Sequence, residues 1–252
     1  SIIDSTNEIW AKYNIDPIGS ITTSDFDILP RGVHLISSGN TKIYDRTTNA
    51  MITNITFADP TNDSGIINND NITLNSTEYE GIYEDYNQTN NQEIKITRKG
   101  SSSISLVGEK KDNYYIASET YTGNITPRPL TLHSLYLEKD DTAHNPRNVK
   151  AYDDTKEAVI SNIIIDNVVA GDAVTTDKTS YAGEYATSEA GETLNKDGTV
   201  KDNRLMLLEE NPITRTEPIS LINDPNGNYF IENEQYSGGI HRLTISVMVS
   251  GF

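Results

Sequence analysis

The stretch Lys42-Ile43-Tyr44-Asp45-Arg46-Thr47-Thr48 has a counterpart in the second half of the chain, Lys150-Ala151-Tyr152-Asp153-Asp154-Thr155-Lys156. Further pairs of segments follow in the same order in both halves, namely Ile67–Thr73 with Val169–Thr175, Glu80–Tyr83 with Ala182–Tyr185, and Asn113–Ile116 with Asn228–Ile231. Self-similarity in a fixed order is the signature of a structural unit that is repeated along the chain. The sequence therefore predicts two tandem copies of one module.

A strand-like segment opens each copy. Gly123–Leu132 joins the two halves, Gly239–Ile245 repeats it near the end, and a divergent copy at Gly19–Leu35 stands near the start. The expected domains are a C-terminal remnant of a preceding repeat (1–28), a first β domain (29–127), a second β domain (128–240) and the first strand of a following repeat (241–252). We thus expect a piece cut from a longer array.

The fold class follows from period-two patterns that are bounded by turn residues. The segments that alternate apolar with polar side chains, or that carry β-branched residues, include Ile94–Thr97, Ile104–Val107, Leu130–Leu132, Ile219–Ile222 and Leu243–Val247. About seven such segments fall in each unit of about 100 residues, which is typical of an immunoglobulin-like sandwich. We predict an all-β chain of tandem immunoglobulin-like β-sandwich domains. The alternative is a β-grasp-like module with a short helix near Asn167–Asp172.

Charge and composition exclude several function classes. The chain has 37 acidic and 20 basic residues, a net charge of -17, so it repels nucleic acid and anionic lipid. It has no cysteine, hence no disulfide framework and no thiolate site. No run approaches the ~18 apolar residues of a membrane span, so we expect no membrane insertion, and any export signal is expected outside this sequence.

Tyrosines recur at equivalent positions of the two halves. Tyr44 matches Tyr152 beside a turn, and Tyr114 matches Tyr229 in the Asn-Tyr segment. Recurrence in both copies favours a packing role, and we expect each hydroxyl to bond to a backbone group, as in a tyrosine corner.

The ordered motifs together carry a family resemblance. Lys-x-Tyr-Asp, Val-Ala-Gly-Asp, Ala-Gly-x-Tyr, Asn-Tyr-x-Ile and Gly-x-Ile-Thr-Pro-Arg-Pro-Leu-Thr resemble the YDG-type repeat of filamentous-haemagglutinin-like bacterial adhesins. The similarity covers nearly the whole chain, and five motifs in order are more specific than any one of them. The departures concern turns: Arg46 and Asp154 replace the glycine after Tyr-Asp, and Asn69-Asp70 stands where Gly-Asp is usual.

The resemblance implies a repeat segment of a large secreted or surface-anchored adhesin, which acts as an elongated stalk and contributes to attachment to host cells, matrix or other bacteria. It implies an extracellular location, with neighbouring repeats and a host or bacterial surface receptor as partners. It brings no catalytic residues. The chain also lacks a Gly-x-Ser-x-Gly elbow, a phosphate loop and a His-Glu-x-x-His motif, so we predict that it is not an enzyme.

A second function class is a carbohydrate-binding module that recognises surface glycans. Its candidate site is Tyr79, Tyr83, Glu84 and Tyr86, because aromatic faces beside carboxylates suit sugars. The competing interpretation is an edge strand whose acids prevent pairing with another chain.

Calcium is the one cofactor that the sequence raises. Asp59, Asn62, Asp63 and Asp70 crowd one loop, but their spacing lacks the Asp-x-Asp-x-Asp-Gly order with a later glutamate that marks a strong site. We therefore expect no cofactor, with calcium at this loop as the alternative.

Overall fold

The computed structural model describes residues 28–58, 65–67, 70–100, 103–136, 147–190, 193–194, 207–208 and 210–242. Within these residues the chain is all-β, as predicted, and the only helical segment is one 3-10 turn, η2 (Lys111–Asn113). The described residues fall into two compact units, one formed by those within 28–36, 55–77 and 103–120, the other by those within 37–54, 78–102 and 121–242. The second repeat lies entirely in the second unit, whereas the first repeat contributes to both.

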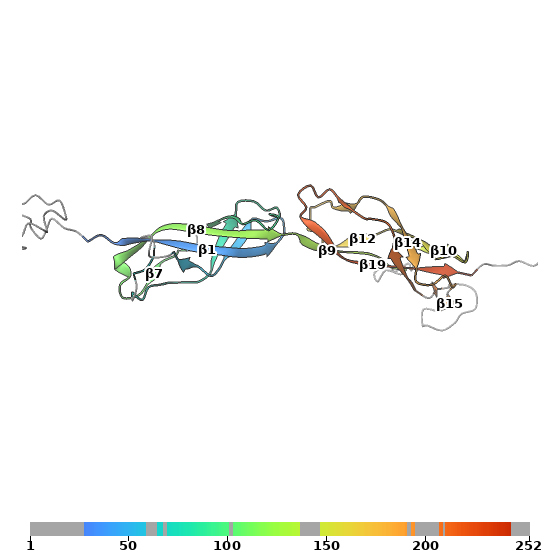
Figure 1. Ribbon diagram of the computed structural model, residues 1–252, viewed down its shortest axis with the longest axis horizontal. Coiled ribbons are helices and arrows are strands. Elements are labelled where there is room, and N and C mark those ends of the chain that lie inside the picture. Colours follow the sequence, from blue (N-terminus) through green and yellow to red (C-terminus); the bar gives the residue numbers. More distant parts are fainter. Residues whose placement is uncertain are drawn as a thin grey trace, which may run out of the picture. The chain divides into compact units, whose positions relative to one another are not determined.

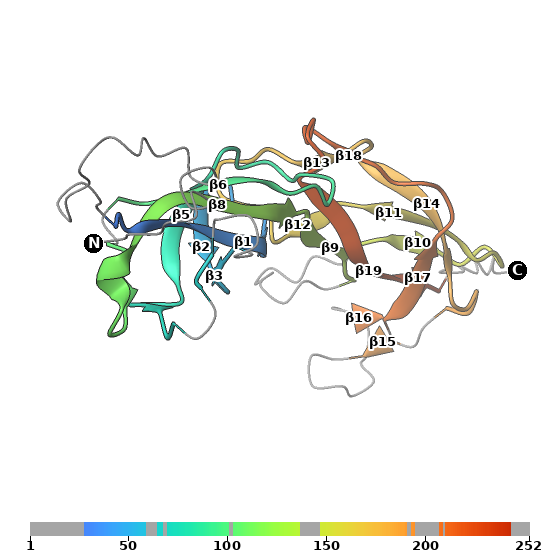
Figure 2. The same ribbon diagram turned by 60° about the vertical axis from the view of Figure 1, so that its left-hand side comes forward.

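The second repeat forms one main sheet (Figure 2). Its strands lie in the order β11 (Glu157–Ser161), β14 (Ser180–Tyr185), β17 (Asn211–Arg215), β19 (Tyr229–His241), β9 (Arg128–Ser134) and β12 (Ile164–Asp166). β10 (Val149–Ala151) pairs with the end of β19. Separate two-stranded pairs are β13 (Thr175–Thr176) with β18 (Leu221–Ile222), and β15 (Thr193–Leu194) with β16 (Leu207–Leu208). β19 runs parallel to β9 and β10, and the other main-sheet pairs are antiparallel.

The first repeat has the same strand order. It reads β2 (Asn49–Ile52), β5 (Tyr79–Tyr83), β6 (Ile94–Arg98), β8 (Tyr114–Thr126), β1 (Arg31–Ile43) and β3 (Thr56–Phe57), with β4 (Thr73–Leu74) and β7 (Leu106–Val107) as a separate pair. β1 and β8 lie side by side (Figure 1). β1 is one strand of 13 residues, whereas its counterpart is divided into β9 and β10. The repetition seen in the sequence is therefore a repetition of topology.

Strands in which buried and exposed side chains alternate form the cores of the two repeats. In β5 and β14 every second residue is buried, so Tyr79 and Tyr83, like Tyr181 and Tyr185, face inward. The first unit has its own cluster around Val33, in which Ile72 and Tyr114 are also buried and Phe57, Ile66, Leu106 and Ile116 pack against them. Each unit thus buries apolar side chains of its own.

The immunoglobulin-like sandwich is not confirmed, because each repeat shows one six-stranded hydrogen-bonded path, with one separate two-stranded pair in the first repeat and two in the second. The segment at 167–172 forms turns, with the amide of Asp172 donating to the carbonyl of Val169, so the short helix of the β-grasp-like alternative is absent there. The segments at 94–97 and 130–132 lie in β6 and β9, only the ends of 104–107 and 219–222 are strand, and 243–247 lies outside the described residues.

Candidate functional site at the junction of the two repeats

Each repeat carries the same corner, a tight turn held by a lysine. Lys42 Nζ donates to Asp45 Oδ1 at 2.6 Å and to the carbonyl of Thr47 at 2.6 Å. Lys150 Nζ repeats this with Asp153 Oδ1 at 2.7 Å and with the carbonyl of Thr155 at 2.9 Å. The corner therefore fixes the residues on either side of it in one conformation.

Asp172 joins the corner of the first repeat to the second repeat. Tyr44 Oη donates to Asp172 Oδ2 at 2.9 Å, and Tyr229 Oη donates to the same oxygen at 2.6 Å. Arg46 Nε lies 3.4 Å from Asp172 Oδ1, and the two tyrosine rings meet edge to face with centroids 5.3 Å apart. All four residues belong to the second compact unit. We call the contacts between the two repeats within this unit the junction.

Burial at the junction changes the acidity of both tyrosines. Tyr44 is 2% exposed, whereas its counterpart Tyr152 is only partly buried. Burial, followed by the hydrogen bond to Asp172, raises the pKa of Tyr229 to about 12, and the same two causes raise the pKa of Tyr44. Both hydroxyls therefore stay protonated and donate over the whole physiological pH range.

Arg128, in the segment that links the repeats, contacts both of them. Its Nη1 donates to the carbonyl of Tyr44 at 3.4 Å, and its Nε donates to the carbonyl of Asn167 at 2.7 Å. The amide of Arg128 donates to the carbonyl of Asn228 at 2.8 Å. A guanidinium suits this position because it carries several donors in a fixed plane.

A set of amide side chains completes the junction. Gln88 donates from its backbone amide to Asn228 Oδ1 at 2.8 Å and from Nε2 to the carbonyl of Asn226 at 2.7 Å. Asn226 and Asn228 each donate from Nδ2 to Asn87 Oδ1 at 3.0 Å. Gly227, with φ of 65°, lets the Asp-Pro-Asn-Gly turn present these groups. A hollow of about 150 Å³ lies among them.

Hydrogen bonds between protein groups link the two repeats at the junction. The corner that the first repeat supplies has the sequence Lys-x-Tyr-Asp. Residues 30–122 match the family model of the YDG domain. No curated protein and no solved structure matches the chain.

The match covers most of the first repeat, so the YDG part of the resemblance is confirmed for that stretch, and the link to adhesins stays a prediction. The two corner residues that replace the glycine of the repeat, Arg46 and Asp154, have φ of 63° and 64°. That backbone conformation favours glycine, so each of the two residues holds a turn in which glycine would be the least strained choice.

The glycan candidates do not gather on one surface. Tyr79 and Tyr83 lie in the core of the YDG domain, 5% and 2% exposed, and the hydroxyl of Tyr83 donates to the carbonyl of Asn40. Glu84 is exposed, and Tyr86 is 43% exposed beside the hollow at the junction. Of the four residues, only Glu84 and Tyr86 are therefore available to a ligand in this structure.

Of the calcium candidates, Asp59, Asn62 and Asp63 lie outside the described residues. Asp70 accepts hydrogen bonds from Lys110 and Tyr114. The parts of the chain that the structure describes hold no group of three or more His, Asp or Glu side chains that could bind a metal ion.

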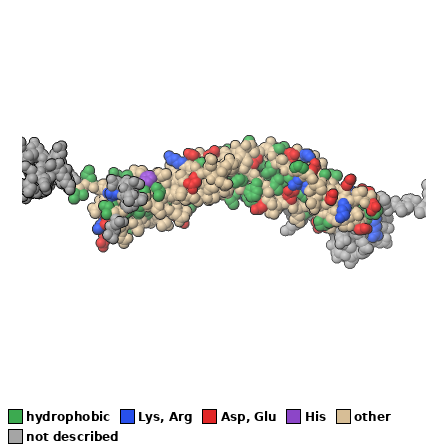
Figure 3. Space-filling view, in the orientation of Figure 1, with side chains coloured by type: hydrophobic (Ala, Val, Ile, Leu, Met, Phe, Trp, Pro, Cys, Tyr) green, Lys and Arg blue, Asp and Glu red, His purple; other side chains and the backbone are tan. Residues whose placement is uncertain are grey.

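The described residues also contain no helix long and apolar enough to cross a membrane. On the face seen in Figure 3, acidic and basic side chains are interspersed.

Tyrosine hydroxyls find two kinds of partner. Those of Tyr44, Tyr114, Tyr152 and Tyr229 donate to aspartate carboxylates. Tyr114 and Tyr229 also accept from the backbone amides of Ile67 and Val169, so the expected backbone partner is confirmed for these two and wrong for Tyr44 and Tyr152. Tyr83 and Tyr185 donate to backbone carbonyls, those of Asn40 and Asn148. The carboxylate partners of Tyr44, Tyr114 and Tyr229 are far away in sequence, which is why local motifs did not reveal them.

Sequence reasoning also missed the buried asparagine of each repeat. Asn40 Nδ2 donates to Ser37 Oγ and to the carbonyl of Thr122, both at 2.9 Å, and its Oδ1 accepts from the amide of Thr53 at 2.8 Å. Asn148 makes the equivalent bonds in the second repeat. A comparison of the two halves could have found this pair, since each asparagine stands two residues before the corner lysine.

Proposed function

We propose that the chain is a repeat segment of a large secreted or surface-anchored bacterial adhesin of the filamentous-haemagglutinin-like kind, located outside the cell. In this role the modules form an elongated stalk that projects a binding region towards a host or bacterial surface receptor. The observation that carries the proposal is the junction, where the corner of one repeat is bonded to the next repeat through Asp172. The match of residues 30–122 to the YDG domain supports the assignment to such repeats.

The proposal assigns no catalysis to the chain. At the junction the pKa values of Tyr44 and Tyr229 are raised, so their hydroxyls stay protonated, donate hydrogen bonds and are weak nucleophiles. For the module itself we propose an immunoglobulin-like sandwich, supported by the number of strands in each repeat. A crystal structure in which the strands of one repeat divide into two facing sheets would agree with it.

Small-angle X-ray scattering of the 252-residue chain tests the stalk. We expect an elongated particle whose distance distribution has two lobes, and a compact globule would contradict the proposal. Binding of the labelled chain to host cells and to matrix proteins then separates a stalk that adheres from one that only spaces. Binding without an elongated particle would point to a receptor-binding domain of another kind.

Glycan recognition is the competing function, and the structure narrows its test. Tyr83→Ala would disrupt the core, so the informative variant is Tyr86→Ala, with Tyr115→Ala as a control at another exposed tyrosine. On a glycan array, binding that is lost in the first variant and kept in the second would favour a carbohydrate-binding module. No binding by the wild-type chain would dismiss it.

A further inference from the structure

The first repeat carries a second copy of the surface that receives the corner. Tyr114 Oη donates to Asp70 Oδ2 at 2.6 Å and accepts from the amide of Ile67, just as Tyr229 Oη donates to Asp172 Oδ2 at 2.6 Å and accepts from the amide of Val169. The opening arginines agree as well. Arg31 Nε donates to the carbonyl of Gly65 at 3.0 Å, and Arg128 Nε donates to the carbonyl of Asn167 at 2.7 Å.

The two receiving surfaces differ in the cation that lies beside the aspartate. Lys110 bonds to Asp70 and its side chain is 57% exposed, whereas Pro225 stands at the equivalent place in the second repeat. At the junction the cation beside Asp172 is Arg46, which comes from the preceding repeat. The surface of the first repeat thus supplies its own cation, and a corner with another arginine would bring two like charges together.

The corner of the second repeat has the complementary charge. Asp154 occupies the position of Arg46, with nearly the same φ, and its side chain is exposed. Tyr152 is partly buried and its Oη donates to Asp154 Oδ1 at 3.1 Å. This corner therefore offers a tyrosine hydroxyl and a carboxylate, where the first corner offers a hydroxyl and a guanidinium.

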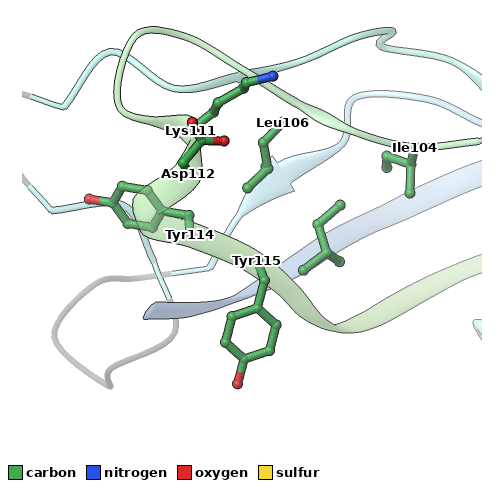
Figure 4. A pocket seen from close by; sticks show the side chains of 7 residues that line it. Ile104, Leu106, Lys111, Asp112, Tyr114 and Tyr115 are labelled. Atoms are coloured by element: carbon green, nitrogen blue, oxygen red, sulfur yellow. The ribbon is translucent and has the colours of Figure 1, made fainter. Parts of the chain in front are cut away.

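An aromatic surface borders the receiving residues of the first repeat. Tyr114 and Tyr115 follow each other on β8 but point in different directions, and Lys111 and Asp112 lie in the turn before them (Figure 4). Tyr115 is 55% exposed and lines a hollow of about 460 Å³ with Leu106. The hollow leaves room for a neighbouring module beside the charged groups.

We propose that Asp70, Lys110 and Tyr114 form a docking surface for a module of the same kind whose corner reads Tyr-x-Asp, such as Tyr152-Asp153-Asp154 of this chain. The incoming tyrosine hydroxyl donates to Asp70, and the incoming carboxylate pairs with Lys110. The corner of the second repeat in one copy then fits the receiving surface of the first repeat in the next copy. The array then has two types of joint, distinguished by the sign of one corner residue, and this charge matches each receiving surface to one kind of corner.

A fusion of two copies of the chain tests the docking surface. Residues 1–241 of one copy are joined to residues 30–252 of the next, because His241 ends β19 as Thr126 ends β8, and Pro30-Arg31 matches Pro127-Arg128. Hydrogen exchange is measured at the amides of Asp153 and Asp154 in the first copy. We expect exchange to be slower in the fusion than in the 252-residue chain by roughly 2- to 10-fold.

Charge reversal supplies the specificity control. In the fusion, Asp154→Lys of the first copy and Lys110→Glu of the second copy are each expected to abolish the slowing, and the double variant is expected to regain most of it. Glu157→Lys changes the net charge equally on the exposed edge strand β11 and should leave the slowing unchanged. Equal exchange in fusion and single chain, or additive effects of the two reversals, would overturn the proposal.

The inference rests on the repeat array of the proposed function and not on adhesion. A chain that binds cells but shows no slowing in the fusion would lose only the docking surface. If the fusion shows the slowing but the chain binds no cells or matrix, the docking surface stands and the chain acts as a spacer.

Discussion

At the scale of single residues, the corner of the second repeat contains a strained backbone conformation at Asp154. Asp154 holds a left-handed backbone with φ of 64°, which costs a non-glycine residue about 1–2 kcal/mol. Glycine would remove that strain but would lose about 0.5–1 kcal/mol of backbone entropy on folding. Glycine also removes the acceptor of the Tyr152 hydroxyl, but that hydrogen bond is exposed and water can replace it. We therefore expect Asp154→Gly to raise the free energy of unfolding by about 0.5 kcal/mol in urea titrations.

The matched variant is Arg46→Gly, at the same place in the YDG domain. It relieves the same strain but removes the contacts of the guanidinium with Asp172 and with the carbonyl of Ala170. We expect it to give no gain in stability. A gain for Arg46→Gly equal to that for Asp154→Gly would mean that the arginine contributes nothing to the junction.

The buried Asn40 gives a larger effect at the same scale. Its side chain satisfies the amide of Thr53 and the carbonyl of Thr122, and alanine would remove this partner from two partly buried backbone groups. Each such group costs about 1–3 kcal/mol, so we expect Asn40→Ala to lower the free energy of unfolding by about 2–4 kcal/mol. Asn233→Ala, on the exposed side of β19, should change it by less than about 0.5 kcal/mol.

At the scale of elements, the lysine-held corner between β10 and β11 predicts sensitivity to acid. The hydrogen bond from Lys150, with further bonds from Thr155, lowers the pKa of Asp153 from 3.8 to about 2. A carboxyl group whose pKa is depressed on folding contributes stability above its unfolded pKa, and this contribution is lost as the pH falls towards the folded value. Asp153→Asn should therefore lower the melting temperature at pH 5 and converge with wild type near pH 2.

Asp154→Asn provides the control, since it removes the same charge one residue away without touching Lys150. Its effect on the melting temperature should vary less between pH 5 and pH 2. If both variants track each other across that range, the acid sensitivity comes from net charge and not from the corner.

The strands divide into those that the sequence predicts and those that it does not. β5, β6, β9 and β14 alternate buried and exposed residues, and local periodicity is sufficient to find them. β19 has a long polar middle, a bulge after Ile231, and a parallel partner about one repeat away in the chain. Pairing of this kind depends on long-range contacts, so it cannot be read from a window of residues. The junction was missed for the same reason, because Tyr44 and Asp172 lie in different repeats.

At the scale of the whole molecule, the stability of the joint between repeats depends on two hydroxyls that share one carboxylate. Tyr44→Phe keeps the ring that meets Tyr229 but removes the hydrogen bond to Asp172. A hydrogen bond to a charged group is worth about 1.5–3 kcal/mol, and Arg46 and Tyr229 remain to satisfy Asp172, so we expect a loss of about 1–2 kcal/mol at pH 7. Urea unfolding of the 252-residue chain measures it, with Tyr115→Phe at an exposed position as the control.

The same joint should weaken at alkaline pH, and the pKa of Tyr229 determines the pH range in which its stability is lost. Its pKa is raised to about 12 on folding from 10.0, so it contributes stability that is complete below pH 10 and is lost as the pH rises through 12. Tyr229→Phe should therefore be less stable than wild type at pH 8, and the difference should shrink at pH 11, where the unfolded wild-type chain gains from ionising the tyrosine. Unfolding in urea at both pH values measures the difference, and absorbance at the phenolate band reports the ionisation directly. A difference that stays constant between pH 8 and pH 11 would show that burial and the hydrogen bond to Asp172 do not hold the hydroxyl of Tyr229 protonated, which would contradict its role in the joint.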